Sequence, residues 1–240
     1  MIQKIEKEKM FLSNQGWLES RFHFSFAEYR DFDNMHFGVL RVLNDDIVHP
    51  QSGFPMHPHE NMEIISYIVD GEITHKDSMG NERTLKRGEV QYMSAGTGVM
   101  HSEYNNHKSE DLRLLQIWIL PPEKGLKPHY GDVIYKEEDR KNSLLHVASN
   151  KKDDDAKVKL YQDVNIYVCE LDAGKELSFE IDENRQIYYV QIEGKALVND
   201  LHPRGTSHVS NGDAVKIVDE NSLHVRALSN IHFLFIEMKV

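Results

Sequence analysis

Short apolar segments recur along the chain, and polar turn residues separate them. The segments are rich in Val, Ile, Tyr, Phe and Leu, whereas Gly, Asn, Asp and Pro gather between them. Helical periodicity is almost absent, so the pattern predicts an all-β protein. We expect short helices only near "YKEEDRKN" and at the N-terminus, and strands over residues 37–46, 63–71, 89–96, 112–121, 164–173, 186–194 and 230–240.

A weak internal repeat organises these strands. Gly71 directly follows "EIISYIVD", and Gly88 comes seventeen residues after Gly71. Gly194 directly follows "QIYYVQIE", and Gly212 comes eighteen residues after Gly194. An apolar strand, a glycine turn, a strand and a second glycine turn therefore occur twice. The repeat predicts two copies of one β-barrel unit, each a closed pair of sheets.

The repeat leads to a prediction of two domains. We expect an N-terminal domain over residues 1–135 and a C-terminal domain over residues 136–240. Between the two repeats, "SNKKDDDAK" (149–157) has the charge pattern of a solvated connection. A length of 240 residues with 40% hydrophobic residues is enough for two separate cores.

Charge and cysteine content narrow the class of protein. A formal charge of -11 disfavours nucleic acid as a partner, because phosphate binding needs clustered Lys and Arg. No segment reaches the ~18 consecutive apolar residues of a membrane span. The lone Cys169 cannot form an intrachain disulfide, and "MIQKIEKEKMF" has no apolar signal-peptide core. We expect a cytoplasmic monomer that binds neither nucleic acid nor membrane.

Two pairs of side chains could bind a metal. His57 and His59 are one residue apart in "GFPMHPHENMEI", and His101 and Glu103 are one residue apart in "GTGVMHSEYN". Side chains alternate along a strand, so each pair lies on one face. If both segments line one barrel, three imidazole nitrogens and one carboxylate oxygen meet. These donors suit Fe, Mn, Ni, Cu or Zn and leave positions open for substrate and oxygen.

Other readings of these residues stay open. In a chain with fourteen histidines, an isolated pair such as His57 and His59 is more often a polar surface feature, and the second pair is what favours a metal site. Glu63 could be a fifth ligand, or an acceptor that orients a histidine N–H. His75 and His107 lack a partner at ligand spacing, so we expect them to be loop or strand residues. For His23 we expect a structural hydrogen bond.

The same segments resemble a known family. The two cupin motifs are approximately matched, although no proline precedes Gly98 and several spacings differ, by His57, His59, Glu63, Gly71, Gly88, Gly98, His101 and Asn105. "GFPMHPHENMEIISYIVDGEITHKDSMGN", "MSAGTGVMHSEYN" and "LQIWILPP" resemble pirin, a two-domain bicupin family that includes bacterial quercetin 2,3-dioxygenase homologues. The resemblance implies an all-β fold of two tandem cupin barrels, which are double-stranded β-helices of the jelly-roll type.

The resemblance also implies a function. It suggests His57, His59, His101 and Glu103 as ligands of one divalent transition metal per chain, most readily Fe(II), with Mn, Ni, Cu or Zn as alternatives. It makes Glu63 non-coordinating. The implied activity is a dioxygenase that cleaves a flavonol such as quercetin with O2, and Glu103 could also accept the substrate's hydroxyl proton. The alternative is a pirin-like regulatory or redox-sensing protein that acts through a protein partner.

Two further expectations concern the surroundings of the site. We expect the pocket lining to come from Phe24, Phe26, Phe37, Met56, Met93 and Ile117, with the alternative that all six belong to the core. In the C-terminal repeat, alignment of the glycines places Glu180 and Asp182 where His57 and His59 stand. The same alignment places Val225 and Ala227 where His101 and Glu103 stand. We therefore expect one metal site per chain, in the N-terminal barrel.

Overall fold

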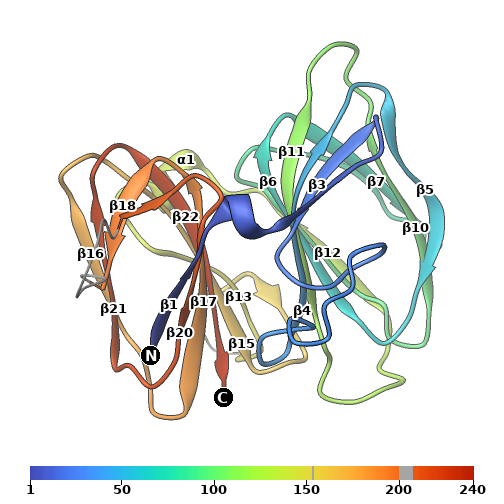
Figure 1. Cartoon of the computed structure of the whole chain (residues 1–240). Coiled ribbons are helices and arrows are strands. Elements are labelled where there is room, and N and C mark those ends of the chain that lie inside the picture. The colour runs from blue at the N-terminus through green and yellow to red at the C-terminus, as the bar shows by residue number, and fades with distance from the viewer. Residues whose placement is uncertain (153, 200–207) are drawn as a thin grey trace. The chain divides into compact units, whose positions relative to one another are not determined.

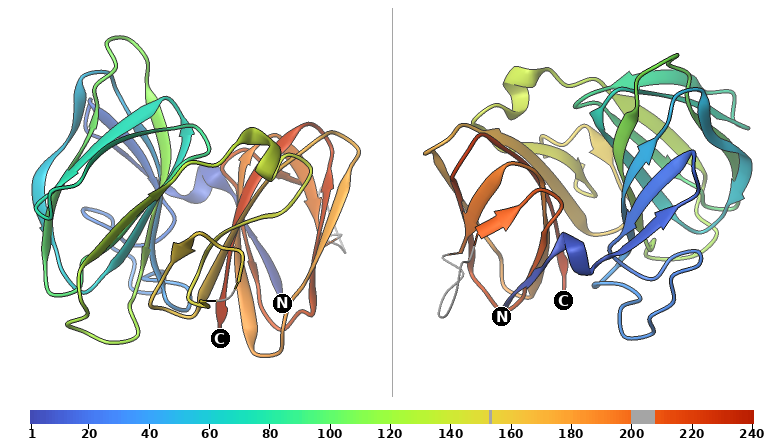
Figure 2. Two further views of the ribbon diagram at one scale, coloured as in Figure 1. Left: turned by 180° about the vertical axis from the view of Figure 1, so that it is seen from behind. Right: turned by 45° about the horizontal axis from the view of Figure 1, so that its top comes forward.

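The protein is built almost entirely from β-strands (Figure 1). The structure is a computed structural model and describes residues 1–152, 154–199 and 208–240. The chain divides into two compact units, shown in two further views in Figure 2. The N-terminal unit comprises residues 11–135 and 160–162, and the C-terminal unit comprises residues 1–10, 136–159 and 163–240.

The N-terminal unit consists of a seven-stranded and a four-stranded sheet. The larger sheet has the order β12 (His129–Val133), β9 (Val90–Ser94), β6 (Glu63–Asp70), β11 (Leu112–Ile119), β4 (Leu40–Val48), β3 (Leu18–Phe22) and β2 (Phe11–Asn14). The smaller sheet has the order β5 (Ser52–His59), β10 (Val99–Asn105), β7 (Glu72–Asp77) and β8 (Glu82–Lys86).

The C-terminal unit repeats this arrangement. Its larger sheet has the order β1 (Ile2–Ile5), β20 (Ala214–Ile217), β17 (Arg185–Glu193), β22 (Ile231–Lys239), β15 (Val164–Leu171), β13 (Leu145–Ser149) and β14 (Val158–Lys159). Its smaller sheet has the order β16 (Glu176–Glu180), β21 (Ser222–Ala227), β18 (Lys195–Val198) and β19 (His208–Ser210). The prediction of two tandem cupin barrels is confirmed.

The seven predicted strands are all present, with ends within about three residues of the predicted ones. Of the two short helices that were predicted, one is α1 (Glu137–Arg140) and the other is the 3-10 helix at Lys7–Lys9. None of the helices in the described residues is long and apolar enough to cross a membrane.

Two segments lie elsewhere than the predicted domain ranges suggest. Strand β1 pairs with β20, so residues 1–10 belong to the C-terminal unit and not to the N-terminal domain (Figure 1). The charged run at 149–157, whose residue 153 lies outside the described residues, connects β13 to β14 inside the C-terminal unit. A solvated connection within one sheet has the same composition as a linker between domains.

The turn that follows β6 and β17 explains the glycines of the repeat. Gly71 and Gly194 have φ of 75° and 80°, a region that side chains disfavour. A Cβ at either position would also meet a backbone carbonyl oxygen, at 2.4 Å from Asp111 and at 2.2 Å from Asn230. Each unit therefore needs glycine where the chain leaves the larger sheet for the smaller one.

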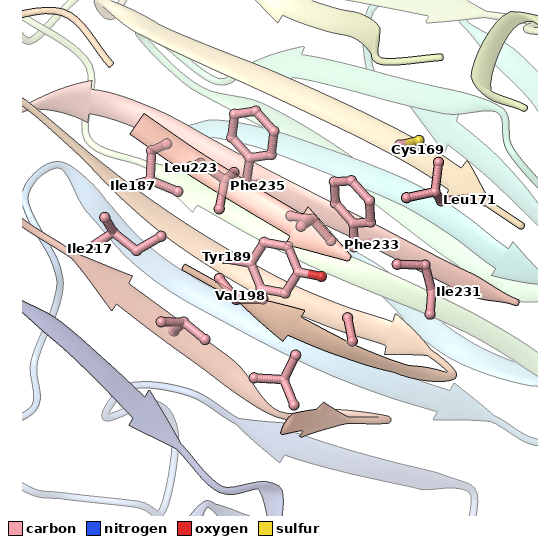
Figure 3. Packing of buried hydrophobic residues seen from close by; sticks show 14 of the residues in the cluster. Cys169, Leu171, Ile187, Tyr189, Val198, Ile217, Leu223, Ile231, Phe233 and Phe235 are labelled. Carbon is pink, nitrogen blue, oxygen red and sulfur yellow. The ribbon is translucent and has the colours of Figure 1, made fainter. Parts of the chain in front are cut away.

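The interior of the C-terminal unit is filled with apolar side chains from both of its sheets. Figure 3 shows this core, in which the rings of Tyr189 and Phe233 stack with centroids 5.3 Å apart. The smaller sheet contributes Ala196, Val225 and Ala227 to the same cluster. Strands β16, β18 and β21 of the smaller sheet alternate in burial and turn one face to this core, whereas β17 and β22 of the larger sheet are buried along nearly their whole length.

Candidate metal centre

The structure brings the three predicted histidines together inside the N-terminal unit. Strands β5 and β10 pair antiparallel, with His57 directly opposite His101 and His59 opposite Val99. One nitrogen from each of His57, His59 and His101 lies within 4.8 Å of the others. The three ring centroids are 4.5 to 4.8 Å apart. Strand alternation therefore places both members of the first pair on the inner face of the sheet, as expected.

The protonation of these rings favours metal binding. His57 Nδ1 lies 2.7 Å from the Pro55 carbonyl oxygen, which only accepts, so the hydrogen is on Nδ1 and Nε2 keeps its lone pair. His57 Nε2 lies 3.1 Å from His101 Nε2. Burial and the neighbouring imidazoles lower the pKa of His59 to about 4 and that of His101 to about 3. Neutral imidazoles of this kind are the form that binds a transition metal.

Glu103 is buried and surrounded by neutral hydrogen-bond donors from the larger sheet. Its Oε1 accepts from Ser66 Oγ at 3.1 Å and from Gln91 Nε2 at 2.7 Å. Its Oε2 accepts from Gln116 Nε2 at 3.0 Å. One of its oxygens lies within 4.8 Å of a nitrogen of His101 and a nitrogen of His75, so it joins a second group of donors that shares His101 with the first.

Glu63 lies outside both groups. It is fully buried at the start of β6, and its Oε1 accepts from Tyr92 Oη at 2.8 Å and from the Tyr161 N–H at 2.7 Å. Its Oε2 accepts from the Gln162 N–H at 2.9 Å. Burial raises the pKa of Glu63 although these hydrogen bonds oppose the rise. The carboxylate therefore anchors residues 160–162 to the N-terminal unit and orients no histidine.

Three of the remaining histidines differ in their surroundings. His75 is fully buried on strand β7, so it is a strand residue as expected, and one of its nitrogens belongs to the second group of donors. His107 lies in the turn after β10, where its Nδ1 accepts the N–H of Glu110 at 2.9 Å. His23 is buried, and burial lowers its pKa to about 4. Neither His107 nor His23 joins a donor group among the described residues.

The expected pocket lining needs correction at two positions. The Met56 side chain is 51% exposed, because it alternates with His57 and faces outward. On β11, Gln116 reaches Glu103, so the adjacent Ile117 faces the opposite side of the sheet. Phe24, Phe37 and Met93 are buried in the core. Phe26 lies near the site through Trp118, whose ring is 5.3 Å from Phe26.

Aromatic residues that the sequence reading missed form part of the wall. The Trp118 ring lies edge-on to His59 at 4.9 Å, and the Tyr130 ring stacks on His75 at 4.6 Å. Trp118 lies two residues after Gln116 and therefore faces the same side of the strand. The polar Gln116 in a mostly apolar strand was thus the sign in the sequence that Trp118 faces the site. His59 also lines a pocket of about 500 Å³ together with Pro58, Glu60, Ser78, Gly98, Val99 and Met100.

The C-terminal unit has apolar residues at every equivalent position. Leu177 pairs with Val225 on β16 and β21, as His57 pairs with His101 on β5 and β10. Phe179 therefore takes the place of His59, and the expected placement of Glu180 and Asp182 there was wrong. Ala227 takes the place of Glu103, and the strand order puts Tyr189, Val215 and Phe235 where Ser66, Gln91 and Gln116 stand.

These residues fit a transition metal in the N-terminal unit. Imidazole nitrogens and a carboxylate suit Fe, Mn, Ni, Cu or Zn, and the lowered pKa values of His59 and His101 leave their lone pairs free of competing protons near neutral pH. The C-terminal unit offers no such set at the equivalent strand positions, all of which lie in the described residues. At the cupin strand positions this chemistry supports a metal site in the N-terminal unit alone; a separate donor group in the C-terminal unit, His146, Asp154 and Asp155, lies outside those positions.

Comparison with known proteins places the chain in a family. Residues 4–119 match the pirin family, and residues 146–238 match the quercetinase C-terminal cupin domain. Quercetin 2,3-dioxygenase of Escherichia coli K12 is 36% identical over 226 residues, which cover 94% of each chain. A pirin-like protein of Caulobacter vibrioides is 36% identical over 237 residues, which cover 99% of each chain.

A solved structure agrees with these relatives. The bacterial pirin YhhW of Escherichia coli, in complex with nickel(II), is 34% identical to this chain and superimposes with a TM-score of 0.91. The match covers 100% of this chain and 99% of that structure. By sequence over nearly its whole length and by its arrangement of two cupin units, the chain belongs to the pirin family.

Proposed function

We propose that the chain binds one divalent transition metal through His57, His59, His101 and Glu103 and cleaves a flavonol such as quercetin with O2. The observation that carries the proposal is the convergence of three imidazole nitrogens within 4.8 Å of one another, with Glu103 beside His101. The names of the relatives and the nickel(II) complex of YhhW support it. Among the metals that suit these donors, Fe(II) is our choice for an oxygen-dependent reaction.

The protein residues have separate tasks in this reaction. His57 and His59 present lone pairs from β5, and His101 presents one from β10. Glu103 accepts the proton of the flavonol hydroxyl on a carboxylate oxygen, and the donors Ser66, Gln91 and Gln116 hold that carboxylate in place. Trp118 covers His59 with its ring and limits the access of water. The metal supplies the redox chemistry between an aromatic substrate and O2.

We also propose that the enzyme works as a monomer in the reducing cytoplasm. Its single cysteine, Cys169, is fully buried in β15, and burial raises the pKa of the thiol to about 12. Such a thiol is neither reactive nor available for a disulfide. Fractionation of cells and light scattering of the purified protein measure these two properties directly.

The metal content of the purified protein tests the proposed ligands. Elemental analysis of the purified protein should find about one metal per chain, and His57→Ala or His101→Ala should bring the content close to zero. Both variants should keep the thermal unfolding transition, because the apolar cores do not include these side chains. His224→Ala, which removes an exposed histidine of the C-terminal unit, is the matched control. Full metal content in both ligand variants would place the site elsewhere.

Oxygen-dependent loss of the long-wavelength absorbance of quercetin tests the activity itself. The iron-loaded wild type should consume quercetin and O2 together, and the two ligand variants should not. A metal-replete wild type that leaves quercetin unchanged would favour a regulatory role through a protein partner.

A further inference from the structure

His75 stands next to the candidate ligands without belonging to the proposed set. It lies on β7 directly opposite Glu103 on β10, and its side chain is fully buried. Its ring stacks on Tyr130 with an interplanar angle of 17°, and its centroid is 5.4 Å from that of His101. These contacts hold the ring in one orientation at the inner face of the site.

The contacts of Asp77 determine which nitrogen of His75 carries the hydrogen. His75 Nε2 lies 3.2 Å from Asp77 Oδ2. Burial raises the pKa of Asp77, but hydrogen bonds from Asn81, His75 and the Met79 N–H outweigh burial and lower it overall. An ionised carboxylate only accepts, so the hydrogen is on Nε2. The neutral ring then has a lone pair on Nδ1, which is buried and has no partner among the described residues.

His101, in turn, has a buried ring nitrogen that lacks an acceptor among the described residues. Its Nε2 faces His57 Nε2 at 3.1 Å, so this nitrogen is the one that points to the other ligands. When Nε2 binds a metal, a neutral imidazole carries its hydrogen on Nδ1. The Nδ1 of His101 is buried and has no hydrogen-bond partner in the part of the chain that the structure describes. A nitrogen of His75 and a nitrogen of His101 lie within 4.8 Å of each other.

We propose that His75 is a positioning residue, whose Nδ1 accepts the Nδ1–H of His101 directly or through one water. Asp77, His75 and His101 then form a chain that fixes the tautomer of His101 and turns its Nε2 toward the metal. This inference rests on the ligand set of the proposed function. Metal-binding histidines commonly donate their other N–H to an acceptor, and loss of that acceptor typically costs roughly 10- to 100-fold in metal affinity.

The C-terminal unit provides an internal comparison. Ala196 stands opposite Ala227 as His75 stands opposite Glu103, and Val198 stands opposite Val225 as Asp77 stands opposite His101. The unit without the ligands therefore also lacks both the acceptor and its carboxylate. A cupin unit can therefore pack without a histidine and an aspartate at these positions. The presence of His75 and Asp77 in the unit that holds the proposed ligands points to a role in the metal site.

Two substitutions of nearly equal size separate hydrogen bonding from packing. His75→Asn places an amide oxygen close to the position of Nδ1, and His75→Leu fills similar space without an acceptor. We expect His75→Leu to weaken Zn(II) binding roughly 10- to 100-fold in competition with a chromophoric chelator, and His75→Asn to keep most of the affinity. His224→Leu, the same exchange at an exposed histidine of the C-terminal unit, is the control and should bind as the wild type does. Equal affinity in the Asn and Leu variants, at whatever level, would overturn the proposal.

Nitrogen-15 NMR of the wild type gives a test that needs no variant to fold. In the Zn(II)-loaded protein, His101 should carry its hydrogen on Nδ1 and His75 should carry its hydrogen on Nε2. A His75 ring with hydrogen on Nδ1 would contradict the proposal even if the metal binds. Quercetin turnover is not used in either test, so an inactive but metal-binding wild type would refute the proposed reaction alone. A wild type that binds no metal would refute both.

Discussion

Glu103 is the one candidate ligand that is surrounded by hydrogen-bond donors. In Glu103→Gln the amide N–H₂ would face Gln91 or Gln116, both of which donate to the carboxylate in the wild type. The variant also loses the charge and the basicity needed to accept a proton. We expect turnover of quercetin to fall by roughly 10²- to 10⁴-fold, the usual contribution of a general base, while metal content falls much less. Steady-state kinetics with parallel metal analysis measure both, and equal losses would mean that Glu103 serves only as a ligand.

Asp46 gives a prediction about pH. It is buried on β4 and accepts a hydrogen bond from Ser20, yet burial raises its pKa from 3.8 to about 7, and the charges of Asp45 and Glu103 add to the rise. The folded state therefore binds this proton more tightly than the unfolded state does. The free energy of unfolding should fall as pH rises through this window, by up to roughly 1.4 kcal/mol per pH unit.

Replacement of Asp46 by Asn should flatten this slope in the metal-free protein. The amide oxygen can still accept from Ser20, and no proton is left to lose. Urea unfolding at several pH values between 4 and 8 measures the slope, with Glu180→Gln, an exposed position, as the control. Parallel slopes in the wild type and Asp46→Asn would show that another group controls the pH dependence.

Residue spacing pointed to the candidate ligands but not to the residues that surround them. The alternation of strand faces is enough to pair His57 with His59 and His101 with Glu103. The donors to Glu103 come from three other strands, so no local spacing reveals them. Each is nevertheless a polar residue flanked by apolar or aromatic residues within a strand, as in "IISYIV" for Ser66 and "LLQIWIL" for Gln116. The sign available in the sequence was a polar residue at an inward-facing strand position that no neighbouring residue or turn explains.

At the scale of the elements, the pairing of β5 with β10 determines the geometry of the site. Gly53 stands opposite Tyr104, and a Cβ on Gly53 would meet the Glu103 carbonyl oxygen at 2.2 Å and the Tyr104 Cα at 2.6 Å. Both are backbone atoms, so Gly53→Ala must push the two strands apart and displace His57 from His101. We expect metal affinity to fall on the order of tenfold or more.

A glycine with space around it provides the control for Gly53→Ala. At Gly131 on β12, the nearest atom to an added Cβ would be His129 Cε1 at 3.8 Å, an ordinary contact. Gly131→Ala should therefore bind metal as the wild type does. Competition with a chelator measures both variants, and unchanged affinity in Gly53→Ala would show that the strands can adjust without moving the ligands.

The two units differ in the number of residues between equivalent positions on their strands. Alignment of the two units on their glycines therefore gave the wrong register. From His57 to Gly71 there are fourteen residues, whereas from Leu177, its counterpart by strand pairing, to Gly194 there are seventeen. An odd difference of three residues reverses which side chains face inward. Alignment on the glycines therefore selected Glu180, which is exposed, in place of the inward-facing Leu177 and Phe179.

For the whole molecule, the candidate metal site lies in the N-terminal unit, whereas the interior of the C-terminal unit is an apolar core. Phe235 is fully buried in the core of the C-terminal unit at the position that Gln116 occupies in the other unit. We expect Phe235→Ala to lower the free energy of unfolding by roughly 3 to 5 kcal/mol, because it leaves a cavity in a dry core. Metal content per folded chain should stay near one. Thermal unfolding and elemental analysis measure the two effects, and loss of metal at full folding would contradict a single site in the N-terminal unit.

The pairing of β1 with β20 has a consequence for synthesis on the ribosome. Ile2 pairs with Ile217, so β1 leaves the ribosome long before its partner strand β20 has been made. The N-terminal unit, which uses only residues 11–135 and 160–162, can assemble meanwhile. Until β20 appears, β1 is an unpaired strand, and the adjacent polar side chains of Gln3 and Lys4, one on each face, keep it from joining other nascent chains. The larger sheet of the C-terminal unit can therefore be completed only after β20 is made, although its strand β1 is made before every strand of the N-terminal unit.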